Sequence, residues 1–252
     1  RDEIGSLARA VSDMSQALRA RIDATEAFAA DVTHELKNPL ASLRSAVDSL
    51  SSVRAPALQD QLLAVIRDDI HRLDRLISDI SEASRLDAQL SRAKFEPIDL
   101  VAMLAALLAS YATRGIERGV RLRFDPPPDP PLCVAGEGAR LERVFENLID
   151  NAISFSPDGG LISISAQRGP LDAVVRIEDE GPGVPETSRE AIFRRFHSVR
   201  PESEAFGRHS GLGLAIARTI VDGHQGSIAV ESREDRLSGA RFVVALPLNE
   251  TP

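Results

Sequence analysis

Residues 31–40 of this chain are Asp-Val-Thr-His-Glu-Leu-Lys-Asn-Pro-Leu, and the apolar residues around them recur at intervals of three and four. This spacing predicts an amphipathic helix with one buried apolar side and other faces in water. Pro39 removes one helical hydrogen bond, so we expect a bend or a loosened turn there. The apolar positions are Phe28, Val32, Leu36, Leu40, Leu43, Val47 and Leu50.

His34 falls outside these apolar positions, so its imidazole should face solvent or a visiting partner. An exposed imidazole can act as a nucleophile, and Glu35 beside it can fix the tautomer and accept a proton. The plain alternative is a solvated His-Glu pair on a helix surface. A zinc site of the HExxH type is excluded, because Asn38 occupies the position of the second histidine.

The 252 residues are 43% apolar, enough for one large or two small folded domains. A net charge of -8 and the lack of a basic cluster argue against a nucleic-acid partner. Cys133 is the single cysteine, so an internal disulfide is excluded. The longest apolar run, residues 100–109, is too short to span a bilayer, and no signal peptide is recognised.

Two long helices are expected before residue 92. Residues 1–22 carry a heptad-like pattern of apolar residues, which needs a partner helix. The regular spacing of apolar residues is interrupted between Ile22 and Phe28. A turn at residues 51–56 leads to a second amphipathic helix, which has Pro56 in its first turn and ends near Leu90. Each helix of this hairpin keeps an uncovered apolar flank, so we expect two copies to pair as a dimeric four-helix bundle. The second stripe comprises Leu58, Leu62, Ile66, Ile70, Leu73, Ile77 and Ile80.

The remaining chain mixes helices with strands and indicates an α+β sandwich, one sheet covered on one face by helices. We expect helices at residues 98–112, 142–155 and 212–224. We expect strands at residues 120–124, 161–166, 173–179, 227–232 and 241–246.

Four local features of this second region favour a nucleotide site. Asn147 and Asn151 share one helix face and can hold a hydrated Mg²⁺. Asp179 follows a strand in the sequence Asp-Glu-Gly-Pro-Gly, where a carboxylate can accept from an exocyclic amine. The sequence Gly211-Leu212-Gly213-Leu214 opens a helix, whose free N–H groups can receive phosphate. Residues 192–196 and 198–210 are expected to form a mobile, charged lid.

Together these motifs resemble those of sensor histidine kinases. Residues 34–40 resemble the H box, 147–152 the N box, 179–183 the G1 box, 192–196 the F box and 210–214 the G2 box. Residues 2–5, at the head of the heptad pattern, are similar to the second helix of a HAMP module. Residues 152–157 and 200–207 further resemble the ChvG-type sensors of alphaproteobacteria.

The resemblance implies a HAMP-derived segment at 1–22, a dimerisation and phosphotransfer domain at 23–92 and a Bergerat-type ATP-binding domain at 93–252. It implies ATP and Mg²⁺ as cofactors, with Asp179 on the adenine amine and with Asn151 and Asn147 on the metal. Backbone approach to the nucleotide is assigned to Gly181, Gly183, Gly211 and Gly213, and Leu212 is counted among the nucleotide-binding residues.

By the same resemblance, His34 attacks the γ-phosphate with Glu35 as base, and the phosphoryl group passes to an aspartate of a response-regulator receiver domain. Asn38 would orient water for dephosphorylation of that partner. The full-length protein is expected to be anchored in the inner membrane, with this part on the cytoplasmic side. A phosphatase-dominant enzyme and a nucleotide-sensing scaffold are the alternatives.

One departure from the family pattern concerns charge at the phosphates. Ser154 stands where many members have Lys or Arg, so the cation is expected from Arg195, Arg200 or Arg208. Arg208 is nearest to the phosphate-binding glycines in sequence. The histidines at 71, 197, 209 and 224 are expected to be structural or incidental.

Overall fold

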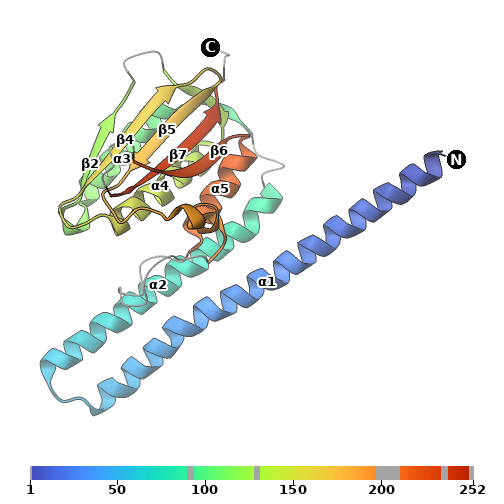
Figure 1. Ribbon diagram of the computed structural model, residues 1–252. Helices are drawn as coiled ribbons and strands as arrows, with labels where there is room; N and C mark the ends of the chain where they lie inside the picture. The colour runs from blue at the N-terminus through green and yellow to red at the C-terminus, as the bar shows by residue number, and fades with distance from the viewer. Residues whose placement is uncertain (1, 90–93, 128–130, 197–210, 234–237, 250–252) are drawn as a thin grey trace. The chain divides into compact units, whose positions relative to one another are not determined.

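The computed structural model describes residues 2–89, 94–127, 131–196, 211–233 and 238–249. The chain divides into two compact units, Arg1–Leu76 and Ile77–Pro252, which are described separately (Figure 1). In the described residues, no helix combines the length and apolarity that crossing a membrane would require.

The first unit is a helical hairpin. Helix α1 covers Asp2–Ser52 and α2 covers Pro56–Gln89, with the part of α2 beyond Leu76 counted in the second unit. Helical structure in α1 continues through residues 22–28 and through Pro39, so the two expected segments form one continuous helix. Pro56 lies in the first turn of α2, as predicted, and is its first residue, where its missing N–H leaves no helical hydrogen bond unmade.

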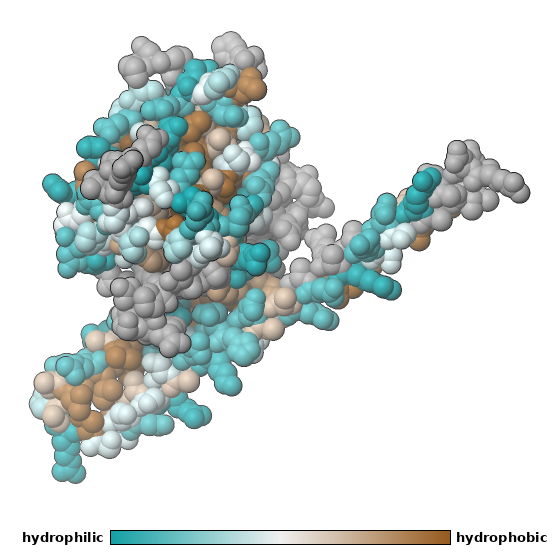
Figure 2. Space-filling model, in the orientation of Figure 1, coloured by the Kyte–Doolittle hydropathy of each residue, from teal (hydrophilic) through white to brown (hydrophobic). Residues whose placement is uncertain are grey.

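The predicted single apolar stripe of α1 proves to be two. Pro39 and Ala46 are buried, and Val32, Leu36 and Leu43 are half-buried. Leu40 and Val47, by contrast, are each 54% exposed. In α2, Leu76 is buried, whereas Leu58, Leu63, Val65, Ile70 and Ile77 are exposed. Each helix therefore uses one side within the hairpin and keeps a second apolar flank, visible as brown surface near the turn in Figure 2.

The N-terminal part of α1 also carries exposed apolar side chains. Leu7, Val11, Met14, Leu18 and Ile22 are between 49% and 72% exposed and follow the heptad spacing. Burying such a stripe requires another helix, as in a coiled coil.

The second unit is built on a five-stranded sheet with the strand order β2-β4-β5-β7-β6. Helices α3 (Leu100–Arg114), α4 (Gly138–Phe155) and α5 (Gly213–Gly223) lie together behind this sheet in Figure 1. Alternate strand residues, among them Ile164, Val175 and Val244, are buried on the covered face. The strands are β2 (Arg121–Asp125), β4 (Leu161–Arg168), β5 (Asp172–Glu178), β6 (Ser227–Ser232) and β7 (Ala240–Pro247).

The predicted helices and strands of this unit are confirmed, with ends shifted by a few residues. Two features were not predicted. Strands β1 (Glu96–Asp99) and β3 (Cys133–Gly136) form a separate antiparallel pair, and β2 runs parallel to β4. Strands of four residues carry too little alternation to be recognised from sequence.

Candidate active site

Helix α4 brings the two asparagines to one side of the second unit. Leu141, Phe145, Leu148 and Ile149 are fully buried, which fixes the rotation of the helix and leaves Asn147 and Asn151 on a half-buried face. The Nδ2 atom of Asn147 is buried and has no hydrogen-bond partner in the described residues. A buried amide nitrogen without an acceptor is expected at a site where a bound ligand supplies that acceptor.

The start of α5 meets this face of α4. A Cβ atom added at Gly213 would lie 3.3 Å from the Oδ1 atom of Asn147, so the two motifs touch. Gly211 has φ +70°, a conformation that favours glycine. The side chain of Leu212 is completely buried in the core, so only its backbone is available to a nucleotide.

Asp179 follows β5 and has only 2% of its surface exposed. Its Oδ1 atom accepts hydrogen bonds from the backbone N–H groups of Gly181 at 2.8 Å and Ala240 at 3.1 Å. Burial raises the pKa of this carboxyl group above its ordinary value, and the two hydrogen bonds and Arg233 oppose the shift. The carboxylate is thus held in a fixed orientation by two N–H groups that bond the same oxygen.

The glycines after Asp179 allow backbone segments to approach closely. A Cβ at Gly181 would lie 2.7 Å from the carbonyl oxygen of Phe155, at the end of α4. Gly183, at φ +77°, faces the Gly239 carbonyl, and a Cβ at Gly239 would lie 2.0 Å from the Asp179 carbonyl oxygen. Gly239 was not predicted as a site residue; the Ser-Gly pair before the last strand was the available signal.

The structure therefore brings Gly213 against Asn147 within α4 and Gly181, with Asp179 bonded to it, against the C-terminal end of the same helix. Glu180 turns away from this cluster, because its Oε2 atom accepts from the N–H of Leu161 at 2.9 Å. This bond anchors the loop after β5 to the start of β4.

Part of the predicted lid is wrong. Ile192 and Phe193 lie in a 3-10 turn, Ala191–Phe193, and both are buried, with Phe193 edge-on to Phe242 at 6.4 Å. Apolar side chains this large are held in the core and cannot serve as a mobile, charged cover. Arg195 is exposed. Arg200, Arg208, His197 and His209 lie outside the described residues, so their predicted roles stay predictions.

Sequence reasoning also missed Arg118, at φ +62° in the turn before β2. Its guanidinium donates to the carbonyl oxygens of Ser154 at 3.2 Å and Ser156 at 2.7 Å and to Asp158 at 2.6 Å. A cation is thereby placed at the C-terminal end of α4, where helix carbonyls lack partners. It reaches the backbone of Ser154, the position expected to carry Lys or Arg in many proteins with these motifs.

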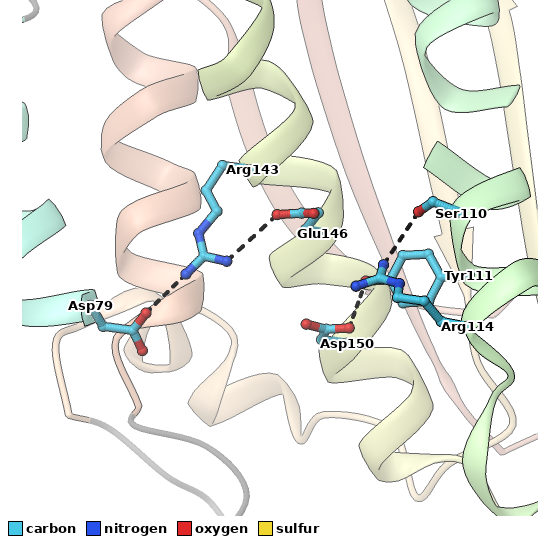
Figure 3. Close-up of polar contacts among 7 residues, drawn as sticks. All are labelled: Asp79, Ser110, Tyr111, Arg114, Arg143, Glu146 and Asp150. Atoms are coloured by element: carbon cyan, nitrogen blue, oxygen red, sulfur yellow. Dashed lines mark hydrogen bonds and ion pairs between the residues drawn. The ribbon is translucent and has the colours of Figure 1, made fainter. Parts of the chain in front are cut away.

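Two separate groups of polar contacts involve α4, one with α3 and one with Asp79 of α2 (Figure 3). The hydroxyl of Tyr111 donates to Asp150 at 2.6 Å, and burial together with that carboxylate raises the pKa of Tyr111. Arg143 contacts both Glu146 and Asp79. Asp150 lies between Asn147 and Asn151 in the sequence, so the bond from Tyr111 fixes the segment that carries both.

In the first unit His34 is exposed, as predicted, and so is Asn38. Glu35 does not need to bond His34 to find a partner: its Oε2 atom lies 3.4 Å from Nη2 of Arg72 on α2. In this structure Glu35 therefore pairs with a residue of the facing helix, and no contact between Glu35 and His34 is seen among the described residues.

His224 is structural, as predicted. It is buried, its Nδ1 lies 2.7 Å from the Ile220 carbonyl, and its Nε2 accepts from the N–H of Glu137 at 3.1 Å. Both ring nitrogens have partners, and the Phe95 ring stacks on the imidazole with the ring centroids 4.8 Å apart, so the side chain has a structural role.

Comparison with known families matches two parts of the chain. Residues 24–89 match the His Kinase A (phospho-acceptor) domain, and residues 136–250 match the histidine kinase-, DNA gyrase B- and HSP90-like ATPase. Neither range includes residues 1–23, so the HAMP resemblance stays a prediction.

Among similar proteins is the sensor protein ChvG of Rhizobium meliloti, 46% identical over all of this chain. The chain spans 45% of the length of that relative. The solved structure of the Acinetobacter baumannii histidine kinase AdeS is 25% identical, with a TM-score of 0.61 over 86% of this chain and 98% of that one. The histidine kinase ThkA, solved in complex with the response regulator protein TrrA, shares the fold at a TM-score of 0.73 and 23% identity, over 92% of this chain and 64% of that one.

Proposed function

Since this chain belongs to the sensor histidine kinases, with their phospho-acceptor and ATPase domains, we propose that it phosphorylates itself on His34 and passes the phosphoryl group to an aspartate of a response regulator. Two observations carry the proposal: His34 is exposed, and in the second unit helix α4 is in contact with both Gly213 and the glycine loop that holds Asp179.

Nucleotide binding is assigned to the second unit. Both hydrogen bonds that hold Asp179 go to Oδ1, so Oδ2 is the atom proposed to accept from the adenine amine. Gly181, Gly183, Gly211 and Gly213 let the backbone come close to the ligand, and Leu212 contributes its peptide group alone.

Mg²⁺ is proposed to be held by Asn151 and Asn147 together with phosphate oxygens. Amide oxygens suit this ion, which keeps most of its waters and takes few protein ligands. The orphaned Nδ2 of Asn147 fits the proposal, since a bound triphosphate would give it an acceptor. When bound, the ion neutralises charge on the β- and γ-phosphates.

The chemical step is a transfer to nitrogen. One ring nitrogen of His34 forms a bond to the γ-phosphorus while the bond from phosphorus to the bridging oxygen breaks and ADP leaves. The other ring nitrogen carries the proton of the neutral imidazole, and this proton passes to Glu35, which acts as general base. In the second transfer the phosphoryl group moves from His34 to a carboxylate of the receiver domain, and the imidazole is restored.

The partners of the proposed kinase are a second copy of the chain and a receiver domain. A homodimer would cover the apolar flanks of α1 and α2, including Leu40, Val47, Ile70 and Ile77. ThkA was solved with a response regulator, which supports a partner of the same kind here. A light-scattering mass of one chain at micromolar concentration would contradict the dimer.

Three functional segments are proposed along the chain. Residues 1–22 are the signalling segment, residues 23–92 the phosphotransfer domain and residues 93–252 the ATP-binding domain. We further propose that the whole protein is membrane-anchored, with these domains on the cytoplasmic side of the inner membrane, as expected for relatives named as sensor proteins.

The test is incubation of the purified chain with γ-labelled ATP and Mg²⁺. Acid-labile, alkali-stable label is expected on wild type and on His71→Gln, a matched control in which another exposed histidine is replaced. No label is expected on His34→Gln or Asn151→Ala. Label that survives in His34→Gln would refute the assignment of the acceptor.

A phosphatase-dominant enzyme is the second candidate, favoured by the exposed Asn38 one turn after His34. In that case phosphorylated regulator should lose its label when this chain is added, and Asn38→Ala should abolish the loss. If dephosphorylation is unaffected by Asn38→Ala, this candidate is removed.

A further inference from the structure

Glu35 and Arg72 form an ion pair inside the helical hairpin, next to the proposed phospho-acceptor. The two atoms lie 3.4 Å apart, and the side chains are 28% and 11% exposed, respectively. A guanidinium so little exposed cannot simply return to water, and in this arrangement it engages the carboxylate proposed as the base.

Asp69 lies one turn before Arg72 on the same helix. It is only 9% exposed, and its Oδ2 atom is buried with no hydrogen-bond partner in the described residues. Residues three apart on a helix are neighbours, with Cβ atoms about 5–6 Å apart. Burying a carboxylate oxygen without a hydrogen-bond donor costs free energy. A neighbouring cation that donates to this oxygen would remove that cost.

We propose that Arg72 is a positioning residue with two acceptors, Glu35 in the arrangement seen here and Asp69 when Glu35 acts as base. Moving the guanidinium from one carboxylate to the other keeps it paired throughout and avoids exposing a buried charge. It also frees Glu35 to take the proton of His34 during phosphoryl transfer. The inference rests on the proposed function, because it concerns the base of that reaction.

The distribution of charge across the hairpin favours this arrangement. Asp69 and Arg72 come from α2 and Glu35 from α1; in this structure Arg72 is paired with Glu35, while the Oδ2 atom of Asp69, one turn away, has no hydrogen-bond partner in the described residues. Only one of the two is paired at a time. Asp68, the neighbour of Asp69, is exposed and has no such role.

The experiment measures kcat and KM for ATP in His34 labelling, using the full chain and the variants Asp69→Asn, Arg72→Gln and the double variant. Asp69→Asn removes the second acceptor and leaves Arg72 on Glu35. We expect kcat to fall about tenfold with KM for ATP unchanged, part of the roughly 10²–10⁴-fold that a general base contributes. Arg72→Gln should retain at least the wild-type kcat, because Glu35 is released.

The decisive comparison is the double variant. If Asp69 acts only through Arg72, Asp69→Asn has no effect in the Arg72→Gln background. Asp68→Asn is the matched control and should leave kcat at the wild-type value. Thermal unfolding of each variant shows that it is folded, and a neutral amide in place of an unpaired carboxylate should not lower stability.

Three results would overturn the inference: a wild-type kcat for Asp69→Asn, an equal fall with and without Arg72, or a kcat below wild type for Arg72→Gln. An equal fall would mean that Asp69 is satisfied by some other group, such as one from a second copy. Failure of the proposed function looks different, because wild type itself would then carry no label.

Discussion

Asn147 and Gly213 lie so close that a Cβ at position 213 would stand 3.3 Å from the Oδ1 atom of Asn147. This contact joins the asparagine-bearing face of α4 to the first residue of α5. A larger side chain at position 213 would therefore displace the Asn147 amide.

The first prediction follows from that contact. Gly213→Ala should push the Asn147 amide away and weaken ATP binding about tenfold, or about 1.4 kcal/mol. Titration calorimetry with ATP and Mg²⁺ measures the change. Gly138→Ala is the matched control, since Gly138 is also the first residue of its helix and a Cβ there would have no neighbour closer than 3.9 Å. Equal affinities of both variants would mean that the contact is not part of the nucleotide site.

The second prediction concerns the close backbone approach at Gly239. Its φ is +136°, and a Cβ would lie 2.0 Å from the Asp179 carbonyl oxygen, so Gly239→Ala should lower the free energy of unfolding by about 3 kcal/mol. Gly159→Ala, at φ +73° in open space, should cost only about 1 kcal/mol. Urea denaturation compares the two. A similar loss in both variants would show that positive φ alone, and not the contact with Asp179, sets the cost.

The third prediction uses the raised pKa of Asp179. Burial raises the pKa of this carboxyl group in the folded state above its value of 3.8 in the unfolded chain. The folded protein is therefore favoured while the group is protonated, and the free energy of unfolding falls as the pH rises above 3.8. At neutral pH the ionised group is therefore a cost to the empty fold. Asp179→Asn should raise the free energy of unfolding by about 1 kcal/mol while ATP binding is lost.

Denaturant unfolding at pH 7 and calorimetry with ATP test the two halves of that prediction independently. The amide can still accept the N–H groups of Gly181 and Ala240 through its oxygen, so the loop should keep its shape. Retained ATP affinity in Asp179→Asn would argue against the adenine assignment.

The fourth prediction concerns Tyr111. Its pKa is raised by burial and by Asp150, so the neutral phenol is favoured in the folded protein. The stability that this gives is complete below the unfolded pKa of about 10 and is lost as pH rises above it. Since the chain has one tyrosine and no tryptophan, ultraviolet absorbance should show that the folded protein does not ionise at pH 10.

Tyr111→Phe should remove the hydrogen bond to Asp150 and cost about 1.5–3 kcal/mol at pH 7, the range for bonds to charged groups. Its stability should also stop falling between pH 9 and pH 11. Ionisation of the wild-type phenol at its ordinary pH in folded protein would contradict the structure at this contact.

Much of the fold follows from residue patterns. The long helices, the helix 138–155 and the strands of the sheet were predicted because their apolar residues recur at helical or alternating spacing over many positions. The single apolar stripe of α1 was wrong in part, since Pro39 and Ala46, not Leu40 and Val47, are buried in the hairpin. Small residues and proline give no signal in such a pattern, although they suit the close approach of two helices.

The residues of the candidate site were likewise predicted in part and missed in part. Asn147, Asp179 and the glycines are recognisable in sequence because motif spacing places them at helix and strand ends. Ile192 and Phe193 were assigned to a lid, because charged neighbours in sequence hid that both pack in the core. Arg118, Gly239 and the Tyr111–Asp150 bond were missed, since each joins segments separated by 36 or more positions.

The sequence by itself determined the motifs, the helical hairpin and the layered second unit, because periodicity and turn chemistry act over a few residues. Only the tertiary structure decided which side of each helix is covered, that Glu35 pairs with Arg72, and that a buried oxygen of Asp69 has no donor within the described part of the chain. Contacts of this kind depend on the rotation and register of one helix against another. These are set by the packing of all the side chains between them and by no short stretch of residues.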